Sequence, residues 1–373
     1  MANAVYLDYN ATAPVKPRVV EVVAEAMASV GNPSSVHAAG RAARKRLSRA
    51  RGQIAALVGA SPDQVIFTSG GTEANNQALK GEGKVAVSAI EHPSVLALAD
   101  EDHIVPVNAD GVIDLQALDE LLRRQRPSRL AVMMANNESG VIQPVKDVAA
   151  IAREASVRLH IDAIQAAGKT PIDFIDLGAD TLSLSAHKIG GPQGVGALIV
   201  RPGVEPASLL KGGAQESRHR AGTENLPGIV GFGEAAALAG ADPGFKDRVS
   251  ALRDRLESAV LQQSPEVRIA GGQAARLPNT SCLVFPGISH ETQLIHFDLA
   301  GIAVSAGSAC SSGKIGPSPV LMAMGFSTSD AASGIRVSLG WNSTDEDVDH
   351  FINACRELLA RTQRTRSQNV RMA

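Results

Sequence analysis

The sequence predicts an α/β protein with a mainly parallel, doubly wound sheet in a large domain, followed by a smaller α/β domain. Over the first two thirds of the chain, short apolar runs alternate with amphipathic helical patterns. Most of the runs are nearly continuous stretches of apolar residues, which is typical of strands buried on both faces. The 373 residues are 44% hydrophobic and 20% charged, which is enough for a sizeable core.

The strands of the large domain follow one another along the chain with helices between them. We expect them at 64–70, 84–90, 129–135, 157–162, 180–185 and 195–200. The amphipathic stretches at 114–125 and 145–155 are predicted helices. In such sheets ligands bind beyond the carboxyl ends of the strands, which is where the unusual residues of this chain cluster.

A long helical pattern at 244–263 marks the expected domain boundary. After it come a strand at 279–285, a helix at 290–301, a strand at 334–340 and a last helix at 344–362. We therefore assign 12–245 to a large ligand-binding domain. Residues 1–11 and 246–373 form the predicted small domain.

Composition and charge exclude several classes of protein. The net charge of −2 and the 3% aromatic content give no reason to expect nucleic acid or an anionic membrane as partner. The first residues show no signal-peptide pattern, and no apolar run approaches the ~20 residues that span a bilayer. Three cysteines are too few for a disulfide framework. We expect a cytoplasmic protein without a metal site.

A candidate imine-forming lysine, Lys188, follows an apolar strand in "SLSAHKIGGPQGVG". A partly desolvated amine in such a place is suited to Schiff-base chemistry, although most loop lysines are simply solvated. Ser185 and His187 flank it and could donate hydrogen bonds to a phosphate.

An acid and an amide end another strand, in "HIDAIQAAGK". Pyridoxal phosphate needs an anion beside its ring nitrogen to keep the ring an electron sink, which suits Asp162. Gln165 could donate to the phenolic oxygen of the ring. Capping of a helix explains Asp162 equally well.

Three further strand ends carry polar or glycine-rich segments. In "FTSGGTEANN" a predicted strand runs through Ser-Gly-Gly-Thr into a helix, and the N–H groups of that turn with the hydroxyl of Thr72 are suited to binding an anion. The geometry of a tight turn explains the glycines equally well. His92 in "EHPSV" could stack on a planar ring and shuttle protons, or be structural. Asn137 lies in "ANNESGVIQP", which a turn also explains.

With these motifs together, the chain resembles the cysteine desulfurases, pyridoxal-phosphate enzymes of the class V aminotransferase group. The resemblance covers nearly the whole chain and includes "YLDYNATAP", "GNPSSVH", "FTSGGTEANN", "EHPSV", "NNESGVIQP", "DAIQAAGK", "SAHKIGGPQGVGAL", "RAGTEN", "AGSACSSG" and "RVSLG". The segment around Cys310, "SAGSACSSGKIGPSPVLMAMG", is similar to the longer-loop subgroup, NifS-like and IscS-like, that feeds iron–sulfur cluster assembly. The implied fold is that of the fold-type I pyridoxal-phosphate transferases.

The resemblance implies a role for each candidate residue. Lys188 forms the imine with pyridoxal 5′-phosphate, and Cys310 receives sulfur from L-cysteine as a persulfide while L-alanine leaves. The other implied cofactor contacts are Gly71, Thr72, His92, Asn137, Asp162, Gln165, Ser185, His187 and Thr223, the last reaching across a homodimer. Asn137 and Arg336 face the substrate, and Arg336 clamps its carboxylate in a bidentate geometry.

Other functions stay open at this stage. A selenocysteine lyase or another aminotransferase of small amino acids could use the same fold. A redox-sensing assembly module would use Cys310 as a sensor thiol. The two other cysteines, Cys282 and Cys355, are expected in the core, and the sulfur acceptor is expected to be a protein such as an iron–sulfur scaffold.

Overall fold

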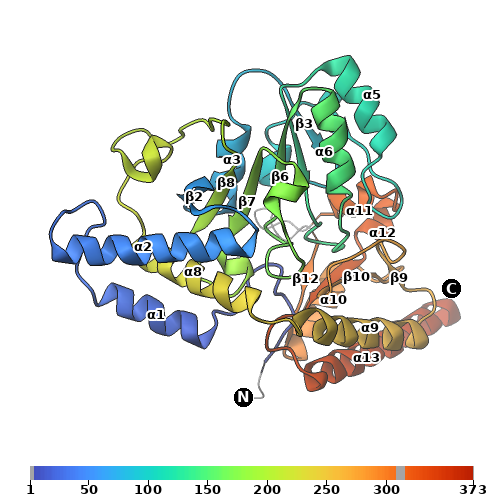
Figure 1. Cartoon of the computed structure of the whole chain (residues 1–373). Helices are drawn as coiled ribbons and strands as arrows, with labels where there is room; N and C mark the ends of the chain where they lie inside the picture. Colours follow the sequence, from blue (N-terminus) through green and yellow to red (C-terminus); the bar gives the residue numbers. More distant parts are fainter. Residues whose placement is uncertain (1–3, 308–315, 373) are drawn as a thin grey trace.

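The large sheet forms the centre of the molecule in the computed structural model, which describes residues 4–307 and 316–372 (Figure 1). Its strand order is β2-β8-β7-β6-β5-β3-β4. The strands span Val65–Thr68 (β2), Val85–Ser88 (β3), Ile104–Val105 (β4), Arg129–Met133 (β5), Arg158–Asp162 (β6), Thr181–Ser185 (β7) and Gly196–Val200 (β8). β3 to β7 run parallel, and β8 is antiparallel to both of its neighbours. The predicted mainly parallel sheet is confirmed; the short edge strand β4 was not predicted.

Helices cover both faces of this sheet, as a doubly wound fold requires. Successive residues of β5 alternate between two clusters: Leu130 and Val132 pack in one, and Ala131 packs in the other. Both faces are therefore buried, which explains why most of the strand runs are nearly continuously apolar. The larger cluster includes residues of α1 (Pro17–Met27), α2 (Ala38–Leu57), α5 (Leu115–Gln125), α6 (Val145–Glu154), α7 (Phe174–Leu177) and α8 (Leu226–Gly240). The opposite face packs against α3 (Gly71–Leu79) and α4 (Pro93–Leu96).

The helix predicted at 114–125 shows how local sequence fixes an element. Asp114 caps α5, because its carboxylate accepts hydrogen bonds from the N–H groups of Gln116 and Ala117. Leu118 and Leu122 lie one turn apart and are both buried. The polar remainder of the helix faces solvent.

A second, antiparallel sheet lies beside the first. Its strands are β12 (Ser305–Ala306), β13 (Gly334–Ser338), β10 (Thr280–Val284) and β9 (Arg268–Ile269), in that order. Figure 1 shows α9 (Phe245–Gln263) and α13 (Asp345–Met372) side by side against it. The remaining elements of this part are α10 (His290–Leu299), α11 (Pro319–Ala323), α12 (Thr328–Ala331) and the parallel pair β1 (Val5–Tyr6) and β11 (Ile302–Ala303).

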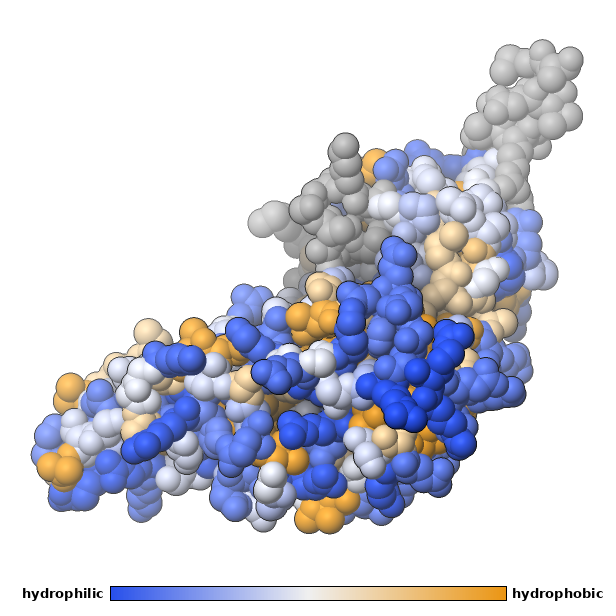
Figure 2. Space-filling model, turned by 90° about the horizontal axis from the view of Figure 1, so that it is seen from above, coloured by the Kyte–Doolittle hydropathy of each residue, from blue (hydrophilic) through white to orange (hydrophobic). Residues whose placement is uncertain are grey.

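The two cysteines expected in the core are both buried. Burial raises the pKa of Cys282 to about 12 and also raises the pKa of Cys355, so both are protonated thiols. Among the described residues, no helix is long and apolar enough to cross a membrane. The face in Figure 2 carries small, separate groups of apolar residues among hydrophilic ones.

Candidate active site

A cavity of about 510 Å³ opens at the carboxyl ends of β6 and β7. All of the predicted site residues except Cys310 and Thr223 line it. Its lining is Asp8, Asn10, Ala11, Gly71, Thr72, His92, Ser94, Met133, Ala135, Asn137, Asp162, Ile164, Gln165, Ser185, His187, Lys188, Ser305 and Arg336. The volume is within the range of small-molecule sites. The two exceptions differ: Thr223 is exposed on the loop before α8, and Cys310 lies outside the described residues.

The glycine-rich turn starts α3 at one wall of the cavity. A Cβ added to Gly71 would lie 2.1 Å from the Cδ1 of Ile164, so a larger residue there would require the side chain of Ile164 to move. The backbone N–H groups of the first turn of a helix, together with its dipole, favour an anion. With Thr72, Ser185 and His187 lining the same cavity, the turn offers a donor set suited to a phosphate.

A buried carboxylate, Asp162, ends β6 at the floor of the cavity. Its Oδ1 accepts a hydrogen bond from the N–H of Ile164 (3.0 Å), and its Oδ2 accepts one from Nδ2 of Asn75 (2.8 Å). Burial raises the pKa of Asp162 despite these bonds. A buried acid of this kind favours a ligand that brings a positive charge to it.

The orientation of the Asn75 amide is fixed by a hydrogen-bonded chain through His160 to Thr181. Its Oδ1 lies 3.0 Å from Nε2 of His160, whose Nδ1 lies 2.9 Å from the Oγ1 of Thr181. Burial lowers the pKa of His160 to about 3, so its ring is neutral. Its Nε2–H donates to Asn75, which directs the amide N–H₂ of Asn75 toward the carboxylate of Asp162.

The amine of Lys188 enters the cavity from η3 (Ala186–Lys188), directly after β7. Its Nζ donates to the backbone carbonyls of Asn10 (2.6 Å) and Ala11 (2.7 Å). The same carbonyl of Asn10 also accepts from Nε2 of Gln165 (2.9 Å). The N-terminal segment therefore holds two of the predicted site residues at one point.

The ring of His92 caps the short helix α4. The backbone N–H of Ser94 donates to its Nδ1 (3.1 Å), so Nδ1 is an acceptor and the ring proton is on Nε2. Burial lowers the pKa of His92, with Lys188 acting in the same direction and Asp162 opposing. The neutral ring is suited both to stacking on a planar ligand and to carrying a proton at Nε2.

A second histidine, His187, is also neutral. Burial, followed by the charge of Lys188, lowers its pKa to about 4. Its Nδ1 lies 3.2 Å from the Oγ1 of Thr12. It can therefore give one hydrogen bond to an anion without bringing a charge.

The guanidinium of Arg336, on β13, lines the opposite side of the cavity. It donates from Nη2 to Asp8 (2.6 Å) and from Nη1 to the carbonyl of Asn137 (3.2 Å). Its buried Nε has no hydrogen-bond partner among the described residues. A guanidinium that is held in a fixed orientation and has an unpaired Nε–H is suited to binding a carboxylate.

Several residues of the site were missed from the sequence. Asn10, Asn75 and Lys169 lie inside the quoted motifs, yet nothing in their spacing indicates which carbonyl or amide they hold. Asp8 was missed for the same reason. For Asn75 and Lys169 the available signal was a predicted residue in the same motif, whereas the motif that holds Asp8 and Asn10 contains no predicted site residue.

A buried glutamic acid, Glu91, precedes His92. Its Oε1 accepts from Oγ of Ser88 (2.5 Å) and from the N–H of Met133 (2.7 Å), while Oε2 has no partner among the described residues. Burial raises its pKa to about 8. Glu91 is therefore mostly protonated at neutral pH.

We expect the free energy of unfolding to fall less with rising pH in Glu91→Gln than in the wild-type protein. Between pH 4.5 and about 8 the folded protein holds the Glu91 proton that the unfolded chain releases, so this residue makes stability fall as pH rises. Circular dichroism melts at pH 5.5 and 8 measure the difference, which should be smaller in the variant. Glu120→Gln, an exposed change on α5, is the control. A variant with the wild-type pH dependence contradicts the expectation.

Comparison with known proteins places the chain among well-defined relatives. The aminotransferase class-V family matches residues 5–351. A cysteine desulfurase of Cereibacter sphaeroides is 42% identical over 366 residues, covering 93% of this chain and 94% of the relative. The cysteine desulfurase IscS of Dictyoglomus turgidum is 39% identical, covering 96% of this chain and 95% of the relative.

Solved structures agree with this grouping. A NifS-like protein from Rickettsia africae superposes with a TM-score of 0.90 at 37% identity, covering 96% of this chain and 99% of that one. A second NifS-like protein superposes with a TM-score of 0.87 at 34% identity, over 96% of this chain and 99% of that one.

Proposed function

The chain belongs to the aminotransferase class-V family and is a pyridoxal-phosphate-dependent cysteine desulfurase, and we propose that Lys188, His92 and Cys310 carry its reaction. The observation that supports this assignment is the meeting of Lys188, His92 and Asp162 in one cavity beside the start of α3. These groups come from separate strands of the large sheet. Only the fold brings them together.

The cavity fits the cofactor at both ends. Gly71 leaves room where a Cβ would collide with Ile164, and that glycine begins the helix whose N–H groups would hold the phosphate. At the other end, the buried Asp162 would pair with the ring nitrogen, and Gln165 would donate to the phenolic oxygen. When bound, pyridoxal phosphate supplies an electrophilic carbon and a ring that stores electron density.

Proton transfer falls to Lys188 and His92. The amine of Lys188 would take the proton from the α-carbon of the substrate and return it later. The neutral ring of His92 would lie against the cofactor plane and carry protons at Nε2. Asp162 keeps its negative charge in the loaded site because its partner there is a cation.

Arg336 and Asn137 are proposed to orient L-cysteine. Since Asp8 and the Asn137 carbonyl already fix the guanidinium, its plane is set before the substrate arrives. The substrate carboxylate then gains charge-assisted hydrogen bonds at little cost in side-chain entropy.

Cys310 is proposed to accept the sulfur. Its thiolate attacks the substrate sulfur, an S–S bond forms, and the C–S bond breaks with its electron pair going to carbon. Reprotonation of that carbon gives L-alanine and leaves a persulfide on Cys310. The other two cysteines are buried with raised pKa values, which makes them poor nucleophiles.

The test is a paired measurement of both products. Incubation of the holoenzyme with ³⁵S-labelled L-cysteine should give L-alanine together with label that stays on the protein until dithiothreitol releases it as sulfide. Alanine without protein-bound label would overturn the persulfide step. A coloured protein that releases no alanine would overturn cysteine as substrate; parallel assays with selenocysteine and with transamination acceptors then decide between the alternatives that the sequence left open.

We propose that the working enzyme is a homodimer. Apolar side chains around α1 and the start of α2 are largely exposed, including Val20 (54%), Met27 (71%) and Val36 (83%). A second copy would cover them. The exposed Thr223 lines no part of its own cavity, which supports the proposal that it contributes to the phosphate site of the partner.

We also propose a cytoplasmic location and a protein acceptor of sulfur, such as an iron–sulfur scaffold. The IscS name of relatives such as that of Dictyoglomus turgidum supports this role. The division into 12–245 and a small domain of 1–11 with 246–373 is retained as a proposal. A second apolar cluster, which joins Val5 and Leu7 to residues between 249 and 359, supports it.

A further inference from the structure

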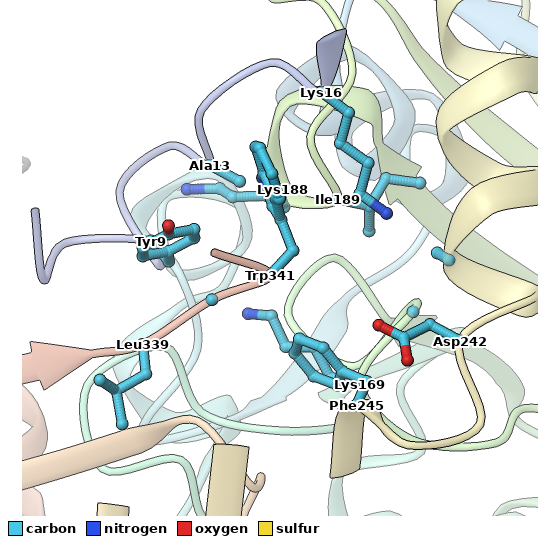
Figure 3. A pocket seen from close by; sticks show the side chains of 13 residues that line it. Tyr9, Ala13, Lys16, Lys169, Lys188, Ile189, Asp242, Phe245, Leu339 and Trp341 are labelled. Carbon is cyan, nitrogen blue, oxygen red and sulfur yellow. The ribbon is translucent and has the colours of Figure 1, made fainter. Parts of the chain in front are cut away.

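A second buried lysine, Lys169, lies next to the site and has no role in the proposed function. Its side chain and that of Lys188 extend in the same direction, toward the segment that carries Tyr9 and Ala13 (Figure 3). Only 7% of Lys169 is exposed. No carboxylate forms an ion pair with it in the part of the chain that the structure describes.

Two amide oxygens receive the hydrogen bonds of Lys169. Its Nζ donates to Oε1 of Gln165 (2.8 Å) and to Oδ1 of Asn10 (2.9 Å). Burying an ammonium group beside neutral partners costs free energy. Burial, followed by the charge of Lys188, therefore lowers the pKa of Lys169 well below its usual value. A buried lysine with a strongly shifted pKa at the edge of a site indicates a functional role.

The contact with Gln165 sets the direction of its amide. The carbonyl of Asn10 can only accept, so it faces Nε2 of Gln165, and an N–H of Lys169 then donates to Oε1 on the other side of the amide. Both contacts therefore fit the same orientation. One N–H of Nε2 goes to Asn10, and the second is left for the cavity that Gln165 lines.

The contact with Asn10 reaches Lys188 as well. Oδ1 of Asn10 accepts from Lys169 and from Nδ2 of Asn279 (3.1 Å), while its backbone carbonyl accepts from Lys188 (2.6 Å). Lys169 thus helps to fix the residue on which Lys188 rests.

We propose that Lys169 is a positioning residue, which directs the amide of Gln165 toward the phenolic oxygen of the cofactor and biases the imine of Lys188 toward its unprotonated form. The inference rests on the proposed function, because it assumes that Gln165 meets that oxygen. The effect on the imine follows from that amide, because an N–H donated to the phenolate stabilises its negative charge and so disfavours protonation of the imine.

The test is a spectroscopic titration of the purified holoenzyme. In Lys169→Met, the pH midpoint of the visible absorption change should rise by about 1 unit. The dissociation constant for pyridoxal phosphate should rise by about tenfold. In Lys169→Arg, which keeps N–H donors at this position, both values should return toward wild type. A small cavity of about 30 Å³ beside Lys169 gives the larger head group room.

The matched control is Lys16→Met. Lys16 lines the same small cavity but makes no hydrogen bond with Gln165 or Asn10 among the described residues. Its midpoint and cofactor affinity should equal those of wild type. If Lys169→Met also keeps the wild-type midpoint and affinity, the inference is overturned, whatever its melting temperature. A wild-type protein without a visible band would instead overturn the proposed function.

Discussion

Replacing Lys188 by alanine should abolish the release of alanine from L-cysteine, with turnover falling by about 10⁴-fold or more. The substitution removes the amine proposed both to hold the cofactor and to move the α-proton. The cost in stability should be small. Of the two carbonyls that accept from Nζ, that of Asn10 keeps Gln165 as a donor, and Ala11 is exposed to water.

Borohydride reduction and peptide mapping identify the attached lysine directly. In wild-type protein the reduced cofactor should map to Lys188, and in Lys188→Ala no covalent adduct should form. The informative rival is Lys169, whose Nζ hydrogen-bonds the same residue, Asn10. An adduct on Lys169 in the wild-type protein would sink the assignment of Lys188.

The sequence was sufficient for six of the seven strands of the large sheet, all but the short edge strand β4, because they are buried on both faces. A short apolar run flanked by helical patterns, such as the run that contains β5, indicates a buried strand. The antiparallel direction of β8 was not predictable in the same way. A run of five buried residues looks the same in either direction, and only the pairing with β2 and β7 distinguishes them.

The candidate site also contains some residues that the sequence indicates and others that it does not. Asp162 and Lys188 were predictable as candidates because Asp162 ends one apolar strand and Lys188 closely follows another. Pyridoxal-phosphate chemistry needs both a carboxylate and an amine. Asn10 was not, because its part is played largely by a backbone carbonyl that accepts from Lys188 and Gln165. Every residue carries such a carbonyl, so no residue type signals it. Such contacts depend on how the N-terminal segment lies against the chain after β7, where the N–H of Ala13 donates to the carbonyl of His187.

Replacing Cys310 by serine should stop desulfuration while leaving the cofactor band in place. A serine hydroxyl stays protonated at neutral pH and forms no persulfide, whereas thiolate chemistry is what the transfer needs. We expect alanine production to fall by about 10³-fold or more, comparable to the loss of a nucleophile in other covalent mechanisms. Absorbance and chromatographic detection of alanine measure the two halves of the reaction separately.

The covalent chain limits how far this thiol can lie from the cavity. Ser305 lines the cavity, and Cys310 follows five residues later, so the two are joined by at most about 17 Å of extended backbone. Cys282 is the rival by position, since it pairs with Arg336 across β10 and β13. Its thiol is buried and its pKa is raised to about 12, so Cys282→Ala should keep full sulfur transfer. Transfer lost in Cys282→Ala and kept in Cys310→Ser would reverse the assignment.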